Sequence, residues 1–308
     1  MKKIPVIFDC DPGHDDALAL IMAFASPKLD IKAVTVCAGN AALDKTLVNA
    51  KKLLRFLGQG VPLAAGAAGP LLRAPVYAPA IHGESGLDGV TLPPPDYPEE
   101  SVNAAELQRR IIMQSPEPVT LIATGPLTNI AILFSASPEV KRNIAQISFM
   151  GGSTGPGNWT AAAEFNFYAD PEAADIVLSS RLPLLMSGLN VTQKALIMKD
   201  EIEALRSLGG KMPVLAAGLL DFYLDSYLKR GFPGAALHDP CAVACLTNPE
   251  LFNSRLYHVA VETQGKYTAG MSVVDLRSWS AVQPNVTVNI DVDRKGFIKL
   301  LMDAAGNY

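Results

Sequence analysis

The sequence is short of charged residues, and basic residues are not in excess. Charged residues make up 18% of its 308 positions, and 26 lysines and arginines against 30 acidic residues give a formal net charge of −4. Nucleic-acid-binding proteins typically carry a basic stripe, so this balance argues against one. No apolar run is long enough to span a bilayer. A hydrophobic content of 49% excludes a disordered chain and predicts a sizeable core.

Cysteine is also scarce, with four residues in the chain. Cys10, Cys37, Cys241 and Cys245 stand in apolar or motif contexts and do not form a disulfide framework. Cys241 and Cys245 are one helical turn apart, a spacing that permits metal ligation, but their apolar neighbours favour a place in the core. The N-terminus runs straight into an apolar segment too short for a signal peptide. These features predict a reduced, cytoplasmic protein.

Linkers, repeats and low-complexity segments are absent too, which predicts one domain over residues 1–308. Apolar segments typical of strands alternate with segments of helical spacing. The expected strands are Ile4–Phe8, Ile31–Val36, Val61–Ala65, Val119–Ala123, Ile144–Met150 and Leu182–Met186, and expected helices begin near Asp15, Leu43, Asn103 and Leu127. This order predicts an α/β fold with a single-domain, mostly parallel Rossmann-like sheet flanked by helices.

Two segments fall outside this alternation. Residues 66–101 are rich in glycine and proline and too long for an ordinary connection, which predicts a functional loop. Near the C-terminus, expected strands at Tyr257–Glu262, Met271–Leu276 and Val286–Ile290 follow one another without helices. We expect a C-terminal strand-rich addition that either extends the sheet or forms an antiparallel unit.

Aspartate, by contrast, is concentrated at the end of the first expected strand. Asp9, Asp11, Asp15 and Asp16 surround a tight turn at Pro12-Gly13, and a helix follows. A loop of this kind lies at the carboxyl edge of the sheet, where open α/β folds bind ligands. Four crowded carboxylates repel one another unless protons, donors or a cation relieve the repulsion. Hard oxygen ligands without a nearby Cys/His pair indicate Ca²⁺ or Mg²⁺, not zinc.

Other interpretations of the aspartate loop account for less of it. The two later aspartates fit as caps of the following helix, which leaves Asp9 and Asp11 unexplained. An EF-hand counted from Asp9 would need a bidentate Glu at its twelfth position, where this chain has Leu20. Aspartate-nucleophile phosphatases also begin their motif with Asp-x-Asp, but Gly13 stands where they usually carry Thr or Val.

Polar residues also follow other expected strands. Asn40 comes after the second strand and Thr124 after the fourth. Taken alone, Asn40 fits a turn and Thr124 a helix cap. Their position at the same sheet edge as the aspartates favours a place in one site.

The stretch 153–169 is expected to be a loop. Glu164 and Asn166 are two residues apart, so in an extended segment they would face the same side and grip a polyol, with Asn158 nearby. A solvated glycine-rich loop is the alternative. Asp170 precedes a proline and is predicted to cap the next helix.

Three of the four histidines fall in expected site segments. They are His14, His82 and His238, and histidine is the side chain that titrates near neutral pH. His238 and Asp239 precede an expected apolar helix at Cys241–Leu246, so Asp239 fits either a ligand or a plain helix cap.

Four stretches carry a family resemblance along essentially the whole chain. They are Asp9-Cys10-Asp11-Pro12-Gly13-His14-Asp15-Asp16, Thr124-Gly125-Pro126-Leu127-Thr128-Asn129, Gly157-Asn158 through Glu164-Phe165-Asn166, and His238-Asp239-Pro240. Together they resemble the motifs of the inosine-uridine nucleoside hydrolase family. The stretch from His82 to Gly89 resembles its bacterial pyrimidine-preferring branch.

The resemblance implies Ca²⁺-dependent hydrolysis of the N-glycosidic bond of ribonucleosides, with uridine and cytidine preferred, for nucleoside salvage. It implies metal ligation by the carboxylates of Asp11, Asp16 and Asp239 and by the backbone carbonyl of Thr124. It implies that Asn158 and Glu164 hold the 5′-hydroxyl side of the ribose and that Asn166 and Asp15 hold the 2′/3′-diol. Asn40, placed by its position at the sheet edge, is expected to bind substrate as well. Asp11 would take a proton from a water held by Ca²⁺, and His238, His82 or both would assist the leaving base.

The base contacts and the wider class are less constrained. Tyr223 and Tyr227 are one turn apart on an expected helix at Pro213–Leu228 and would reach over the site, or else belong to the core or a subunit contact. A broad-specificity inosine/uridine hydrolase, a metal-dependent phosphohydrolase and a non-catalytic nucleoside-binding protein are the alternatives. A phosphohydrolase is disfavoured because no basic phosphate-binding cradle lies near the aspartate loop. A non-catalytic binding protein is disfavoured because it would not need the base that Asp11 provides. Family members are commonly dimers or tetramers, so we expect a homodimer or homotetramer that takes a small-molecule ribonucleoside.

Overall fold

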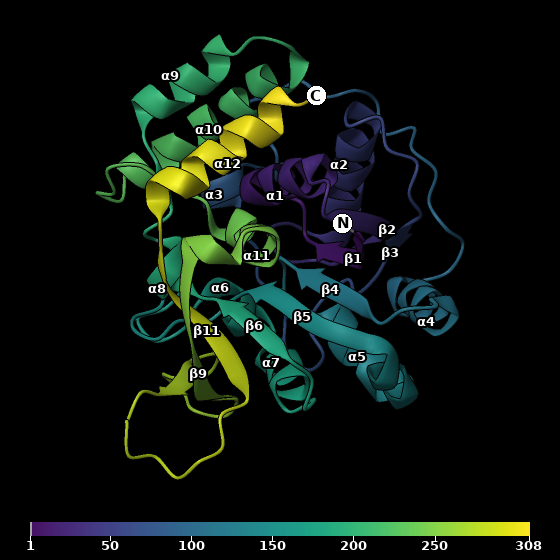
Figure 1. Ribbon diagram of the computed structural model, residues 1–308, viewed down its shortest axis with the longest axis vertical. Coiled ribbons are helices and arrows are strands. Elements are labelled where there is room, and N and C mark those ends of the chain that lie inside the picture. Colours follow the sequence, from purple (N-terminus) through teal and green to yellow (C-terminus); the bar gives the residue numbers. More distant parts are fainter. Residues whose placement is uncertain (1) are drawn as a thin grey trace.

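A computed structural model describes residues 2–308, and one large twisted sheet runs through it (Figure 1). Within these residues the sheet has nine strands in the order β10-β9-β11-β6-β5-β4-β1-β2-β3. They are β1 (Ile4–Cys10), β2 (Leu29–Val36), β3 (Leu63–Ala65), β4 (Val119–Ala123), β5 (Ile144–Met150), β6 (Leu184–Ser187), β9 (Phe252–Val261), β10 (Ser272–Asp275) and β11 (Val286–Val292). Two short strands, β7 (Leu196–Ile197) and β8 (Ala235–Ala236), pair separately.

The strand order creates a switch point in the middle of the sheet. β1 pairs in parallel with both β2 and β4, so the chain moves outward in one direction through β2 and β3 and in the other through β4, β5 and β6. In open α/β sheets, ligands bind at the carboxyl ends of strands beside such a switch point. The loops after β1 and β4 therefore occupy the place where a site is expected.

The C-terminal strands extend the same sheet. β11 pairs in parallel with β6, and β9 then pairs antiparallel with both β11 and β10. Both expected alternatives are therefore partly right, because an antiparallel unit continues the parallel sheet at one edge. β9 also begins five residues earlier than the expected strand, at Phe252.

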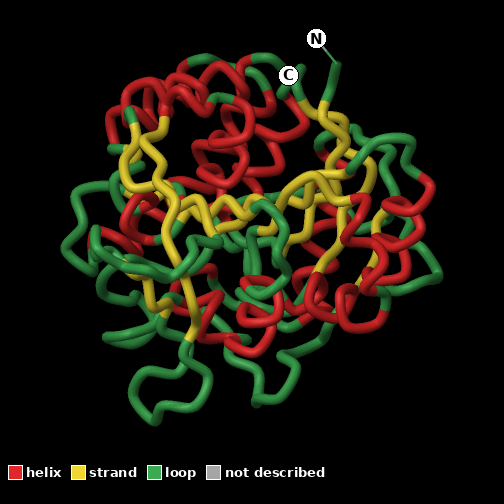
Figure 2. Tube along the Cα trace, turned by 60° about the horizontal axis from the view of Figure 1, so that its bottom comes forward, coloured by secondary structure: helices red, strands yellow, loops and turns green. Residues whose placement is uncertain are grey.

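Helices cover both faces of the sheet (Figures 1 and 2). One face carries α1 (His14–Ala25), α2 (Leu43–Phe56), α9 (Lys199–Ser207), α10 (Lys211–Leu228), α11 (His238–Thr247) and α12 (Arg294–Gly306), and the other carries α4 (Ala104–Gln114), α5 (Thr128–Ala136) and α7 (Pro171–Leu178). Shorter helices are α3 (Pro79–His82), α6 (Phe165–Ala169), α8 (Leu189–Thr192) and the 3₁₀ turns η1 (Pro138–Asn143) and η2 (Pro249–Leu251). No helix in residues 2–308 combines the length and apolarity needed to cross a membrane.

The alternation of side chains along β1 decides which aspartates face the site. Val6, Phe8 and Cys10 pack into the core on the α1 side, whereas Ile7 packs into the core on the α4 side. Because successive strand residues point to opposite faces, Asp9 shares the direction of Ile7. It turns toward α4 and α5 and away from α1.

Two local expectations were wrong. Residues 165–169 are not extended, because the Glu164 carboxylate accepts hydrogen bonds from the backbone N–H groups of Asn166 and Phe167 and so caps α6. The helix after Ala236 begins at His238 and not at Cys241, which places His238 and Asp239 in its first turn.

Candidate active site

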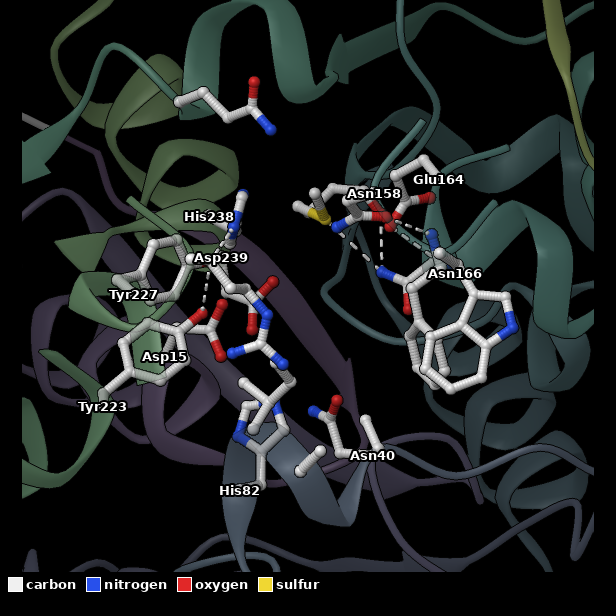
Figure 3. Close-up of a pocket in the computed structure, with 18 of the residues that line it drawn as sticks. Asp15, Asn40, His82, Asn158, Glu164, Asn166, Tyr223, Tyr227, His238 and Asp239 are labelled. Carbon is white, nitrogen blue, oxygen red and sulfur yellow. Dashed lines mark hydrogen bonds between the residues drawn. The ribbon is translucent and has the colours of Figure 1, made fainter. Parts of the chain in front are cut away.

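A cavity of about 710 Å³ opens at the carboxyl edge of the sheet. Most of the predicted site residues line it: Asp15, Asn40, His82, Thr124, Asn158, Glu164, Asn166, Tyr223, Tyr227, His238 and Asp239. Figure 3 shows Asn158, Glu164 and Asn166 on one side of the cavity, and His238, Tyr223 and Tyr227 on the opposite side. Asp11 and Asp16 are buried against the lining residues Asn40 and Thr124.

Three buried carboxylates form a cluster beside the cavity. Asp15 and Asp16 come from the first turn of α1 and Asp239 from the first turn of α11, and each offers an oxygen within 4.8 Å of the others. Burial, and then the charge of Asp16, raises the pKa of Asp15 to about 7. Burial likewise raises the pKa of Asp239 well above its ordinary value. The positive ends of two helix dipoles offset only part of this negative charge, so the cluster is suited to a cation.

The Asp11 carboxylate lies next to this cluster, with one oxygen engaged and one free. Its Oδ2 accepts a hydrogen bond of 2.7 Å from the backbone N–H of Asn40, whereas its buried Oδ1 has no partner in residues 2–308. A Cβ at Gly39 would come within 2.1 Å of Oδ2, and one at Gly125 within 2.5 Å of Oδ1. Burial, and then the charge of Asp16, raises the pKa of Asp11 well above its ordinary value. The two glycines thus leave room for a carboxylate whose free oxygen needs a proton or a cation.

Asn40 and Thr124 hold the Asp16 carboxylate in place. The Asn40 amide Nδ2 donates to Asp16 Oδ2 at 3.0 Å, and the Thr124 hydroxyl donates to Asp16 Oδ1 at 2.7 Å. The Gly13 backbone N–H donates to Asp16 Oδ2 at 2.9 Å. Asp16 is therefore fixed as an acceptor on the side facing the cluster.

Asp9, the first aspartate of the motif, is not part of the site. Its Oδ1 accepts hydrogen bonds from Thr35 on β2, Gln108 on α4 and Asn129 on α5. Burial raises the pKa of Asp9 to about 7. Asp9 joins the sheet to the two helices beneath it and has a structural role.

The donor set fits a hard divalent cation. Carboxylate oxygens of Asp15, Asp16 and Asp239 converge, and the Oδ1 of Asp11, which has no partner in residues 2–308, lies beside them. Among the described residues, neither a cysteine sulfur nor a histidine nitrogen belongs to this cluster. Buried carboxylates without a counter-charge are costly. Oxygen-only ligation is typical of Ca²⁺ and Mg²⁺.

The opposite wall is built around Asn166. Its Nδ2 donates to the backbone carbonyl of Thr124 at 2.7 Å and to that of Met150 at 3.1 Å, which fixes the amide at the ends of β4 and β5. Glu164 is 2% exposed and accepts from the backbone N–H of Gly152 as well as those of α6. Burial raises the pKa of Glu164 to about 7. Asn158 is exposed at the rim, and its Oδ1 accepts from the Phe165 N–H.

The remaining wall consists of neutral histidines and aromatic residues. His238 Nδ1 lies 2.7 Å from the Thr192 hydroxyl, and its Nε2 lies 2.5 Å from the Tyr227 hydroxyl, which is 3.3 Å from that of Tyr223. Burial lowers the pKa of His238 to about 4. Burial, and then the proximity of other histidines, also lowers the pKa of His82 well below its ordinary value. This wall offers flat apolar surface and neutral hydrogen-bonding groups.

The structure adds lining residues that the sequence did not indicate. They are Tyr77, Trp159, Gln193, Arg230 and Phe232, together with short segments around α3 and α6. Gln193 follows β6 and α8, so its position after a strand could have predicted its place at the carboxyl edge of the sheet. Arg230 follows the end of α10, and no local pattern marks it.

A family model described as "Inosine-uridine preferring nucleoside hydrolase" matches residues 6–299. The pyrimidine-specific ribonucleoside hydrolase RihA of Citrobacter koseri is 51% identical over 308 residues, covering 99% of each chain. The protein of the same name from Escherichia coli K12 is 50% identical over 303 residues, covering 97% of each chain.

Solved structures agree with these matches. The purine-preferring ribonucleoside hydrolase from Gardnerella vaginalis superposes with a TM-score of 0.91 at 30% identity, over 98% of each chain. An inosine-uridine preferring nucleoside hydrolase from Bacillus anthracis, at 20% identity and a TM-score of 0.83, shares the fold over the full length of both chains.

Proposed function

The chain belongs to the inosine-uridine preferring nucleoside hydrolase family, and we propose that it is a Ca²⁺-dependent hydrolase of ribonucleosides that prefers uridine and cytidine. One observation carries the proposal. A buried carboxylate cluster lies at a cavity that has a polar wall at Asn166 and, opposite it, a wall of neutral histidines and aromatics, with Asp15 and Asp239 on the side of His238 and the tyrosines. Such a cavity suits a ribose at its polar end and a planar base at the other.

Ca²⁺ fits the donor set better than Mg²⁺. Asp11, Asp16 and Asp239 would hold it with the Thr124 carbonyl, and the remaining positions would be left for the ribose hydroxyls and water. A mixed and flexible oxygen shell is typical of Ca²⁺, whereas Mg²⁺ requires a near-ideal octahedron. When bound, the ion favours the ionised carboxylates, lowers the pKa of water beside Asp11 and anchors the ribose diol.

Asp11 acts as the general base in this mechanism. Its carboxylate takes a proton from water while the water oxygen forms a bond to the anomeric carbon. The C–N bond breaks at the same carbon, its electron pair passes to the base, and the base takes up one proton. Water is thereby divided between the new ribose hydroxyl and the N–H of the free base.

The polar wall orients the sugar. Asp15 and Asn166 would hold the 2′- and 3′-hydroxyls, and Asn158, Glu164 and Asn40 would contact the rest of the ribose. The Asn166 amide is already fixed by two carbonyls, so little order is lost when ribose binds. Positioning of this kind can be worth ~7–11 kcal/mol in favourable cases.

The histidines assist departure of the base. Burial keeps His82 and His238 neutral. His82 is suited to donating a hydrogen bond to the oxygen or nitrogen on which charge develops, whereas His238, whose nitrogens contact Thr192 and Tyr227, would act through the Tyr227 hydroxyl. The relatives named for pyrimidine specificity support uridine and cytidine as the preferred substrates. A broad-specificity hydrolase is the second candidate, because the purine-preferring enzyme from Gardnerella vaginalis shares the fold throughout.

The test is release of ribose from uridine, cytidine, inosine and adenosine, each with and without a chelator. We expect uridine and cytidine to be cleaved fastest, loss of activity on chelation, and recovery with Ca²⁺. Activity that survives complete removal of divalent cations would contradict the metal assignment. Equal rates on all four substrates would favour the broad-specificity candidate.

Assembly and location are further parts of the proposal. We propose a homodimer or homotetramer in the cytoplasm. All four cysteines are free and buried, which agrees with a reducing compartment. Light scattering of the purified protein and fractionation of its host cells test the two statements.

A further inference from the structure

His14, the first residue of α1, connects three parts of the molecule from a fully buried position. Its Nε2 lies 2.9 Å from the backbone carbonyl oxygen of Asp88, in the loop after α3. Its ring stacks on Phe222 of α10 with centroids 4.9 Å apart and planes 5° apart. Its Nδ1 and its backbone nitrogen each lie 3.2 Å from Nδ1 of His82. His14 does not line the cavity, but it stacks on two rings that do, those of His82 and Tyr223.

The contacts of His14 define the protonation of both rings. A carbonyl oxygen only accepts, so His14 carries its proton on Nε2 and its Nδ1 is bare. A backbone N–H only donates, so His82 Nδ1 accepts from His14 and the His82 proton is on Nε2. The opposite arrangement would leave the buried N–H of His14 without an acceptor in residues 2–308, which is unfavourable because a buried donor without a partner keeps its full desolvation penalty.

The remaining nitrogen of His82 is free to meet a substrate. Its Nε2 makes no hydrogen bond in the described part of the chain, and His82 lines the cavity. The ring fits closely against the start of α1 because residue 13 is glycine, where a Cβ would lie 2.6 Å from His82 Nδ1. The ring also packs against Tyr223, with centroids 5.7 Å apart.

We propose that His14 is a positioning residue for the leaving base. Its backbone N–H anchors His82 Nδ1, and its ring, stacked on the His82 ring with centroids 5.4 Å apart, keeps the His82 Nε2–H directed into the cavity; His14→Ala removes the ring and keeps the backbone donor. The inference rests on the proposed function, since it names how the base end of that site is ordered. A pyrimidine that departs with its bond electrons gains negative charge on its oxygen and nitrogen atoms. A fixed Nε2–H donor stabilises that charge without reorganisation, and a His82 ring free to turn loses this advantage.

The experiment is a double-mutant cycle between the two histidines, read with two substrates. His14→Ala, His82→Ala and the double variant are compared with wild type on uridine and on 4-nitrophenyl riboside, whose nitrophenolate leaves as a stable anion. His14→Gln serves as the conservative variant, because its amide N–H can replace the bond to the Asp88 carbonyl. Thermal unfolding confirms that each variant is folded.

We expect His14→Ala to lower kcat for uridine by up to ~10²-fold with a smaller change in KM, as for a misplaced catalytic group. The loss on 4-nitrophenyl riboside should be much smaller, and His14→Gln should recover part of the uridine rate. In the His82→Ala background, removal of His14 should have little further effect, because the two residues act as one unit.

Two results would overturn this inference. Additive losses in the double variant, or equal losses on both substrates, would show that His14 only stabilises the fold, while leaving the proposed function intact. A folded wild-type protein that cleaves no ribonucleoside would overturn the inference and the proposed function together.

Discussion

The Tyr227 hydroxyl lies 2.5 Å from Nε2 of His238, whose Nδ1 is 2.7 Å from the Thr192 hydroxyl. Both nitrogens of His238 are therefore engaged within the protein, whereas Nε2 of His82 has no hydrogen-bond partner among residues 2–308. The two histidines that line the cavity are not equivalent. In the proposed mechanism, His82 would meet the base directly, and His238 would act on it through Tyr227 or after rearrangement.

This difference predicts unequal effects on pyrimidine hydrolysis. His82→Ala should lower kcat/KM for uridine by ~10²-fold or more, the lower end of what a general acid–base group contributes. Tyr227→Phe should cost less than His82→Ala, because it removes a hydroxyl but keeps the aromatic wall. Steady-state kinetics on uridine checks both values. A larger loss for Tyr227→Phe would show that the hydroxyl relay at His238 is the main contact of the base.

A second prediction concerns the room that Gly125 leaves for Asp11. A Cβ at Gly125 would come within 2.5 Å of Asp11 Oδ1, the oxygen without a partner in the described residues. Gly125→Ala should therefore displace the carboxylate and lower kcat strongly while the protein stays folded. Asp11→Asn sets the limit and should remove activity nearly completely, since loss of a general base typically costs ~10²–10⁴-fold.

The matched control is Gly155→Ala, where an added Cβ would meet nothing within 4 Å. It lies in the loop before α6 and should leave kcat and the melting temperature unchanged. An Asp11→Asn variant with more than a tenth of wild-type activity would contradict the mechanism. A Gly125→Ala variant as active as Gly155→Ala would contradict the placement of the carboxylate.

The polar wall predicts a strong requirement for the ribose 2′-hydroxyl. Asn166→Ala removes an amide held by the carbonyls of Thr124 and Met150, so those groups and the sugar both lose a partner. Activity on uridine should fall, and deoxyuridine should be a poor substrate for the wild-type enzyme because Asp15 and the cation lose a contact. Equal kcat/KM for uridine and deoxyuridine would rule out the ribose assignment.

The positions of the polar site residues could be predicted from the sequence more reliably than the contacts between residues far apart in the chain. The strand ends at Asp11 and Thr124 were predictable, because apolar β-branched runs mark buried strands and parallel strands end at one sheet edge. The direction of the Asp9 side chain was also predictable, because strand alternation places it on the same face as Ile7 and opposite to Val6 and Phe8. The aspartate motif alone does not distinguish Asp9 from the other aspartates. Helix α12 was missed, although Phe297 and Leu301 carry helical spacing.

Other features depend on contacts that no local pattern encodes. His14 meets His82 across 68 positions in the sequence, and neither residue's neighbours predict the other. The extended interpretation of Glu164 and Asn166 was wrong because a side-chain cap at Glu164 started a five-residue helix. A loop without periodicity gives no signal for such a cap, since the decisive donors are backbone groups placed by the fold.

The raised pKa values predict how stability depends on pH and Ca²⁺. In the cation-free protein, burial raises the pKa of Asp15 from 3.8 and that of Glu164 from 4.5, each to about 7. The folded state thus binds these protons more tightly than the unfolded chain, so the free energy of unfolding falls as pH rises from about 4 to about 7. Ca²⁺ needs ionised ligands, so its stabilising effect should be largest above pH 7.

Calorimetry at pH 5.5 and pH 8, with chelator and with Ca²⁺, measures this prediction. The melting temperature of the chelated protein should be lower at pH 8, and added Ca²⁺ should raise it more at pH 8 than at pH 5.5. A chelated protein that is more stable at pH 8 would contradict the assignment of buried, protonated acids.

The last prediction concerns which base the cavity prefers, pyrimidine or purine. Tyr223 and Tyr227 are 1% and 9% exposed and line the cavity, so their rings limit its width. A hydrophobic wall alone discriminates weakly, because one methylene's difference in fit is worth only about 1–3 kcal/mol. Directed hydrogen bonds discriminate more, and His82 supplies the free donor.

We therefore expect kcat/KM for uridine and cytidine to exceed that for inosine by at least ~100-fold, which corresponds to about 2.7 kcal/mol. His82→Ala should reduce the pyrimidine rates more than any purine rate and so narrow this ratio. The measurement is a side-by-side assay of uridine, cytidine and inosine with wild type and variant. Inosine hydrolysed as fast as uridine would remove the pyrimidine preference while leaving the hydrolase intact. If His82→Ala left the ratio of pyrimidine to purine kcat/KM unchanged, the buried imidazole would contribute equally to both classes of base. The aromatic wall would then be the source of the base preference.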